Sequence, residues 1–180
     1  MKKIVIILLS LGCICFGIFL VCQATEEEKP YQEAKITYDY IREEVAEPVD
    51  ESTEPMERKI DFDALQQKNR DIIAWLYVPG TQIDYPVCRG EDIDFYLHHN
   101  AEKESNILGA LFVPPENNSE LNNAHVIIFG HNMRQGQMFG ELSNYEKEDF
   151  MAEKGIWIYD GEMWSIDGNK RPFCFIFLFF

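Results

Sequence analysis

The chain has 180 residues, 46% of them hydrophobic and 26% charged, so it has room for one modest folded domain and an appendage. Its formal net charge of -15 argues against a nucleic-acid partner, because binding a phosphate backbone requires clustered lysine and arginine side chains. The four histidines lack the spacing of a helical zinc site, so we expect no metal and no cofactor.

An uncharged apolar run from Ile4 to Cys22 follows two lysines near the amino terminus. Its length is close to the roughly 20 residues with which a helix crosses a bilayer, so it predicts a transmembrane anchor. The lysines favour a cytoplasmic amino terminus, which would put the rest of the chain on the outer side of the cell membrane. The alternative is a cleaved signal peptide that ends at Cys22-Gln23-Ala24. We therefore expect residues 1–25 to form a cytoplasmic tip and an anchor.

Residues 26–59 are strongly acidic and contain three prolines, a composition that is poor at building a core. We interpret them as a solvated stalk. Four apolar residues within them recur at spacings of four, three and four, the stripe of a short amphipathic helix: Ala34, Tyr38, Ile41 and Val45. The alternative interpretation is a helix that docks on the domain.

The composition changes at Ile60, where we expect the folded domain to begin. Asp61 or Asp63 can cap a helix that runs to about Asn69. Two β-rich segments then flank the breaker pair Pro79-Gly80 and predict a hairpin of residues 72–78 and 83–87. Further strands are predicted at residues 109–113, 125–129, 155–159 and 162–166, and helical turns at residues 92–97 and 138–150.

Many short strands separated by turn residues indicate a mainly β domain over residues 60–166, a small barrel or sandwich with short connecting helices. His98 and His99 follow a helical turn and are interpreted as surface or cap residues, while His125 starts a strand and is interpreted as structural. His131 stands where a buried strand meets a glycine-flanked loop, and strand ends often present reactive groups. It is the candidate catalytic residue, with a polar turn residue as the alternative.

Three segments follow one another along the domain: DIIAWLYVPGTQIDYPVCRGEDIDFYL, GALFV and NNAHVIIFGHNMRQGQMFGELSNY. In this order and at these separations they resemble the class B sortases, membrane-anchored transpeptidases of Gram-positive bacteria. The resemblance runs from about Ile60 to about Ile166. It implies a sortase-like β-barrel that cleaves a sorting signal of the Asn-Pro-x-Thr type and joins it to a cell-wall amine. The implied partners are the sorting-signal peptide and the peptidoglycan amine.

The family chemistry uses a cysteine thiolate as nucleophile, a histidine that moves protons and an arginine that stabilises the charge on oxygen. The resemblance gives the histidine's role to His131 and puts Leu97 near the substrate groove. The family's Thr-Leu-x-Thr-Cys strand and the arginine strand after it are not found here. Cys174 stands among phenylalanines, Arg171 has no predicted strand and Cys88 is interpreted as a packing residue, so none of the three is assigned a catalytic role.

Residues 167–180 resemble nothing in the family and end in eight apolar residues. This run is too short to cross a membrane and lacks the alternation of a half-buried strand. A frameshift or premature stop after about Ile166 would explain both features, and the protein would then be a truncated, inactive sortase with an incomplete barrel that lacks its last strands. A buried terminal strand is the alternative. The second functional hypothesis is a non-catalytic surface module that binds a sorting-signal peptide or a wall component.

Overall fold

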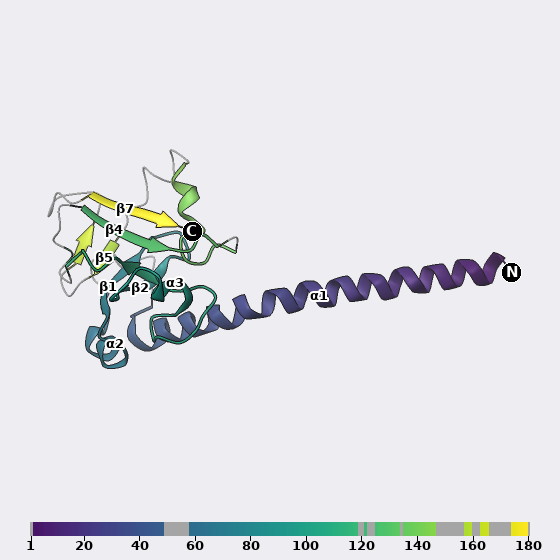
Figure 1. Ribbon diagram of the computed structural model, residues 1–180, viewed down its shortest axis with the longest axis horizontal. Helices are drawn as coiled ribbons and strands as arrows, with labels where there is room; N and C mark the ends of the chain where they lie inside the picture. The colour runs from purple at the N-terminus through teal and green to yellow at the C-terminus, as the bar shows by residue number, and fades with distance from the viewer. Residues whose placement is uncertain are drawn as a thin grey trace.

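The protein is represented by a computed structural model that describes residues 2–48, 58–118, 121, 125–133, 135–146, 157–159, 163–165 and 174–179. A long helix projects from a β-rich body (Figure 1). This helix, α1 (Lys2–Val45), is continuous over 44 residues and includes Pro30. The predicted anchor lies in its projecting half, where the large apolar side chains that the structure describes are exposed.

Helix α1 contains one apolar stretch within Ser10–Val45 that is long enough to cross a membrane, judged by length and composition. The stretch lies near the amino terminus and is not covered by the body of the protein. An anchor and a signal sequence both have these properties, so the two interpretations of residues 1–25 share the same structural basis.

The carboxyl-terminal part of α1 packs on the β-rich body. All four residues of the predicted stripe are buried, with at most 5% of each exposed. The ring of Tyr38 meets the ring of Tyr85 edge to face, with 5.2 Å between their centroids. The interpretation of residues 34–45 as a solvated stalk is therefore wrong, because burial of this stripe stabilises a docked helix.

The first elements of the domain agree with the sequence prediction. Helix α2 (Phe62–Lys68) begins after Asp61, whose carboxylate accepts a hydrogen bond from the Ala64 N–H at 2.9 Å. Strand β1 (Ile72–Tyr77) then pairs antiparallel with β2 (Asp84–Arg89), so the predicted hairpin is confirmed.

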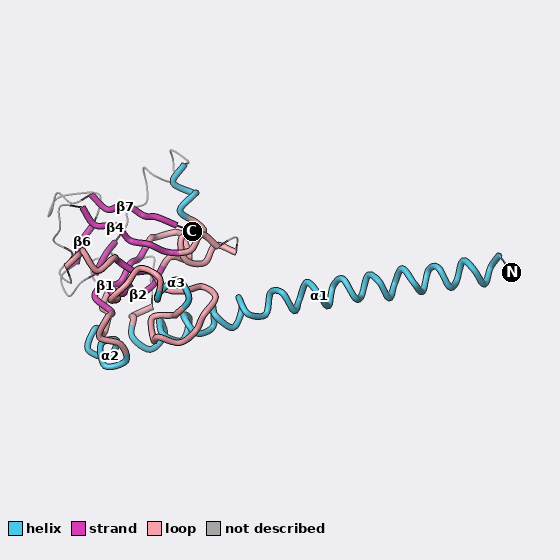
Figure 2. Tube along the Cα trace, in the orientation of Figure 1, coloured by secondary structure: helices cyan, strands magenta, loops and turns pink. Residues whose placement is uncertain are grey.

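Five more strands extend this hairpin into a seven-stranded sheet with the order β6-β5-β1-β2-β3-β4-β7. The strands are drawn in magenta in Figure 2. The five additional strands are β3 (Leu111–Val113), β4 (His125–Gly130), β5 (Trp157–Tyr159), β6 (Met163–Ser165) and β7 (Cys174–Phe179). The antiparallel pair β5–β6 lies where the sequence predicts two strands. Among the described strands the pairings form one open row, so a closed barrel is not confirmed. The short connecting elements are α3 (Phe95–His98) and the 3-10 helix η2 (Leu142–Glu146).

Strand β7 departs from the interpretation of the last residues as a tail without family structure. It runs parallel to β4, with Cys174 opposite His125 and Phe179 opposite Gly130. Strands in parallel pairing are often continuous apolar runs, so the lack of alternation did not exclude a strand here. The terminal-strand alternative therefore describes residues 174–179.

A buried ionic cluster around Asp84 ties α1 and the segment before α2 to the hairpin. The Arg58 guanidinium donates two hydrogen bonds to the Asp84 carboxylate, at 2.7 and 2.9 Å. The Trp75 indole N–H donates to the same carboxylate at 2.6 Å, and Arg42 of α1 lies 3.0 Å from it. Asp84 and Arg58 are both more than nine-tenths buried. The cluster therefore joins three segments of the chain at one carboxylate.

Candidate functional site

His131 directly follows Gly130, the last residue of β4, at the start of a loop that folds back on itself. The His131 carbonyl accepts a hydrogen bond from the Phe139 N–H at 2.9 Å, and Asn132 forms an antiparallel bridge with Met138. The imidazole is half-buried. The end of the strand and the closed loop together fix the backbone from which this side chain projects.

The imidazole of His131 contacts the carboxyl-terminal end of α3. Its Nε2 lies 2.8 Å from the carbonyl oxygen of Leu97. A carbonyl oxygen can only accept a hydrogen bond, so Nε2 must carry the proton in this contact. In the neutral imidazole Nδ1 is then the nitrogen that can accept a proton. The structure thus brings together the two residues that the resemblance assigned to the site.

A buried polar network holds α3 in place. The Tyr96 hydroxyl accepts a hydrogen bond from the Asn69 amide at 2.8 Å and donates one to the Asp71 carboxylate at 2.7 Å. Burial raises the pKa of Tyr96, so its hydroxyl remains a donor. Burial alone would raise the pKa of Asp71, but hydrogen bonds from Lys103 and Tyr96 lower it below its ordinary value. This network fixes the helix whose last turn presents the Leu97 carbonyl.

Gly109 packs against the backbone of the same turn of α3. Its φ is 59°, a backbone conformation that favours glycine. A Cβ at this position would lie 2.6 Å from the Tyr96 carbonyl oxygen and 2.8 Å from the Leu97 carbonyl oxygen. Neither Gly109 nor Tyr96 is a candidate from the sequence, although the glycine of GALFV, two residues before β3, is a signal for close backbone approach.

Neither Cys88 nor Cys174 is brought to His131. Cys88 of β2 lies opposite Phe112 of β3, which lies opposite Phe129 of β4, so about 10 Å of sheet separates Cys88 from β4. Cys174 lies opposite His125, the first residue of β4, and the strand from there to His131 measures about 20 Å. The remaining cysteines belong to the projecting half of α1: Cys13, Cys15 and Cys22.

Cys88 is expected to resist thiol reagents in the folded protein. It is fully buried, and burial raises the pKa of its thiol well above the ordinary value, whereas the thiolate is the reactive form. Treatment of the full-length protein in detergent with a maleimide, followed by peptide mass spectrometry, should show Cys88 reacting at least about 100-fold faster in unfolding urea than without it. Equal rates in the two conditions would mean that the thiol is accessible in the fold.

Three of the described arginines form contacts away from His131. Arg42 and Arg58 bind Asp84, and Arg89 donates to the carbonyls of Pro115 and Asn117. Arg171 lies outside the described residues. The described part of the chain therefore supplies the site with an imidazole and a backbone carbonyl, and with none of these three guanidinium groups.

The other histidines lie at the surface, cap and strand positions that the sequence predicts. His98 is the exposed last residue of α3. His99 caps that helix, stacks on Phe95 with 4.0 Å between ring centroids, and donates from Nδ1 to the Phe95 carbonyl at 2.8 Å. His125 begins β4. No cluster of three or more potential metal ligands occurs in the portion of the chain that the structure describes.

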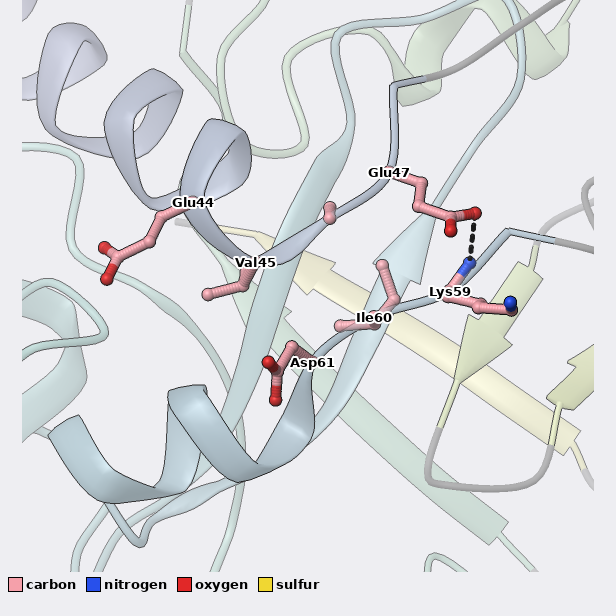
Figure 3. Close-up of a pocket in the computed structure, with 7 residues that line it drawn as sticks. Glu44, Val45, Glu47, Lys59, Ile60 and Asp61 are labelled. Carbon is pink, nitrogen blue, oxygen red and sulfur yellow. Dashed lines mark hydrogen bonds between the residues drawn. The ribbon is translucent and has the colours of Figure 1, made fainter.

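A surface hollow of about 320 Å³ lies where the end of α1 meets the start of α2 (Figure 3). The Lys59 N–H donates to the Glu47 carboxylate across it at 3.3 Å. Its lining has three acidic residues, three apolar residues and one lysine, and it does not include His131: Glu44, Val45, Ala46, Glu47, Lys59, Ile60 and Asp61. The hollow therefore belongs to the packing of the amino-terminal segments and not to the histidine site.

No family model matches the chain, but it is similar to two curated relatives. It is 35% identical to sortase B of Listeria monocytogenes over 119 residues, which cover 62% of this chain and 48% of the relative. It is 31% identical to sortase B of Staphylococcus aureus over 101 residues, which cover 56% of this chain and 41% of the relative. The matches thus span less than half the length of these curated relatives.

Solved structures of class B sortases also match this chain. Sortase B of B. anthracis in complex with AAEK1 matches with a TM-score of 0.64 and 31% identity, covering 76% of this chain and 65% of that one. A mutant form of Clostridium perfringens sortase B matches with a TM-score of 0.55 and 38% identity, covering 58% and 50%. The described domain therefore has a sortase-like fold. The matched part of the chain is thus similar to class B sortases.

Proposed function

We propose that the protein is a membrane-anchored, class B sortase-like protein whose surface around His131 and Leu97 receives a sorting signal of the Asn-Pro-x-Thr type. The observation that carries the proposal is the 2.8 Å hydrogen bond from His131 Nε2 to the Leu97 carbonyl. It orients the imidazole and leaves Nδ1 as the proton acceptor of the neutral ring. A histidine held in this way at a strand end suits proton transfer to and from a peptide amine.

In the family reaction a cysteine thiolate attacks the threonine carbonyl, the peptide amine leaves as it takes a proton, and a cell-wall amine then displaces the thiolate. His131 would supply the first proton from Nδ1 when its ring is doubly protonated, and the neutral ring that remains would accept the second proton at Nδ1. We propose that this polypeptide does not itself complete the reaction. The register of β7 supports this proposal, because Cys174 lies beside His125 at the opposite end of β4.

For the position in the cell we propose that residues 1–25 are the cytoplasmic tip and membrane anchor and that the domain faces outward. Residues 60–166 would be the sortase-like domain, residues 167–180 the carboxyl-terminal segment whose strand β7 pairs with β4, and residues 26–59 the connection between anchor and domain. The apolar stretch of α1 and the two lysines that precede it support this arrangement. The partners are then the sorting-signal peptide of surface proteins and the peptidoglycan amine.

The second candidate function is a surface module that binds the sorting-signal peptide without cleaving it. The intact contact between His131 and Leu97 favours this candidate, because the binding surface can form without a nearby thiol. Binding and cleavage make different demands on the same peptide, so one experiment separates them.

The full-length protein in detergent should bind a fluorogenic Asn-Pro-x-Thr peptide and release no fluorescence above the buffer rate. Fluorescence anisotropy measures binding, and dequenching measures cleavage. His131→Ala should leave the cleavage rate at the buffer level. Leu97→Asp should weaken binding at least about 10-fold, because a charge would face an apolar peptide surface.

His98→Ala is the matched control, since it removes an exposed imidazole one residue from Leu97. It should leave peptide binding unchanged. Cleavage that depends on His131 would refute the proposed inactivity and identify an active sortase. Absence of binding by the folded parent protein would refute the proposed binding surface.

A further inference from the structure

The hydroxyl of Tyr38 links α1 to the histidine site. Tyr38 lies on the docked face of the helix with 2% of its surface exposed. Its hydroxyl donates a hydrogen bond to the carbonyl of Gly109, 71 residues further along the chain. Buried tyrosine hydroxyls are normally paired, and the partner here is the backbone of the segment that supports α3.

The position of Gly109 is coupled to that of α3 because their backbones are in close contact. Its Cα lies against the carbonyls of Tyr96 and Leu97, where there is no space for a side chain. The next residue, Ala110, donates its N–H to the Tyr96 carbonyl at 2.8 Å, and Gly109 donates to Asn106 at 3.1 Å. A shift of the Gly109 peptide must therefore move the last turn of α3 or break these bonds.

The last turn of α3 presents the carbonyl that holds the imidazole. Leu97 accepts the hydrogen bond from His131 Nε2 at 2.8 Å, and this bond selects the Nε2-protonated tautomer. Four residues from separate parts of the chain thus form one series of contacts, which we call the support chain: Tyr38, Gly109, Leu97 and His131.

We propose that Tyr38 is a positioning residue for His131, acting through Gly109 and Leu97, so that the helix continuous with the apolar anchor is a part of the site. Tyr38 does not touch the imidazole or a substrate. The hydrogen bond from its hydroxyl fixes the position of the Gly109 peptide group, and this position determines the direction of the Leu97 carbonyl. The inference depends on the proposed function only for the role of the imidazole in proton transfer. The support chain itself is defined by the contacts between its four residues.

The test is the tautomer of His131 in the full-length protein, labelled with 15N-histidine and held in detergent micelles. Long-range 1H–15N spectra separate the two ring nitrogens, and His131→Asn assigns the signals. The parent should show the Nε2-protonated pattern. Tyr38→Phe removes only the hydroxyl and should shift the His131 nitrogens toward the values of a mixture of tautomers.

Tyr40→Phe is the matched control, because Tyr40 lies on the same helix with 63% of its surface exposed. Its His131 signals should equal those of the parent. The signals of His98 should stay unchanged in every variant. Unchanged His131 nitrogens in Tyr38→Phe would overturn the proposal.

Ile41→Val provides a second arm that does not depend on the folding of Tyr38→Phe. It trims the same docked face and keeps the hydroxyl, so the Nε2-protonated pattern should persist. Loss of that pattern in Ile41→Val would also overturn the proposal, since packing alone would then set the ring. The measurement needs neither peptide nor turnover, so failure of the proposed peptide binding and failure of this inference give separate results.

Discussion

Replacement of Asp84 by asparagine is expected to lower the free energy of unfolding by about 3 to 5 kcal/mol, which is the usual loss when one partner of a buried ion pair is removed. Asp84 is 6% exposed, and its carboxylate accepts hydrogen bonds from Arg58 and Trp75 and also pairs with Arg42. Asparagine keeps the size of the side chain but leaves the buried Arg58 guanidinium without a counter-charge. The segments joined at this carboxylate should then separate more readily.

Urea unfolding followed by tryptophan fluorescence measures this effect, since Trp75 is fully buried beside the carboxylate. Asp39→Asn is the matched control, because Asp39 also pairs with Arg42 but has 42% of its side chain exposed. Its loss should be within about 0.5 kcal/mol, as for other surface pairs. Equal losses in Asp84→Asn and Asp39→Asn would mean that the buried cluster does not hold the fold together.

Gly109→Ala is the second change with a large expected effect, a loss of about 3 kcal/mol in the free energy of unfolding. Alanine is strained at a φ of 59°, and its Cβ would lie 2.6 Å from a backbone carbonyl that cannot rotate away. The strain is relieved only if the last turn of α3 moves. We therefore also expect the variant to lose the contact between His131 and Leu97.

The same urea titration measures the stability of Gly109→Ala. Gly17→Ala is a suitable control, because a Cβ at Gly17 would meet nothing within 4 Å. That control should leave the unfolding midpoint of the domain where it is in the parent. A parent-like midpoint in Gly109→Ala would show that the backbone at this turn can adapt without loss.

The elements that could be predicted from the sequence are those whose signals are local. Asp61 caps α2 through its own neighbours, and the pair Pro79-Gly80 defines the hairpin whatever surrounds it. The docking of α1 could not be deduced in this way. The stripe that contains Tyr38 indicates an amphipathic helix, but it does not say whether a protein surface covers it.

Strand β7 could not be predicted with the same certainty, for a related reason. Its six residues carry no alternation, and the feature that identifies it as a strand is a parallel neighbour nearly 50 residues earlier in the chain. In the site, His131 could be proposed from its place at the end of a strand and Leu97 from the family resemblance. The hydrogen bond between them could not, because its acceptor is a backbone carbonyl and any side chain carries the same one.

The unbroken course of α1 has a mechanical consequence for the proposed protein. An α-helix rises about 1.5 Å per residue, so the distance from Cys22 to Ala34 is about 18 Å. A rigid helix of this length would hold His131 at a fixed distance from the membrane surface, whereas a flexible linker would allow this distance to vary. A peptide substrate would then have to approach at that distance from the membrane. The length of the helix would determine how far the domain extends into the cell wall.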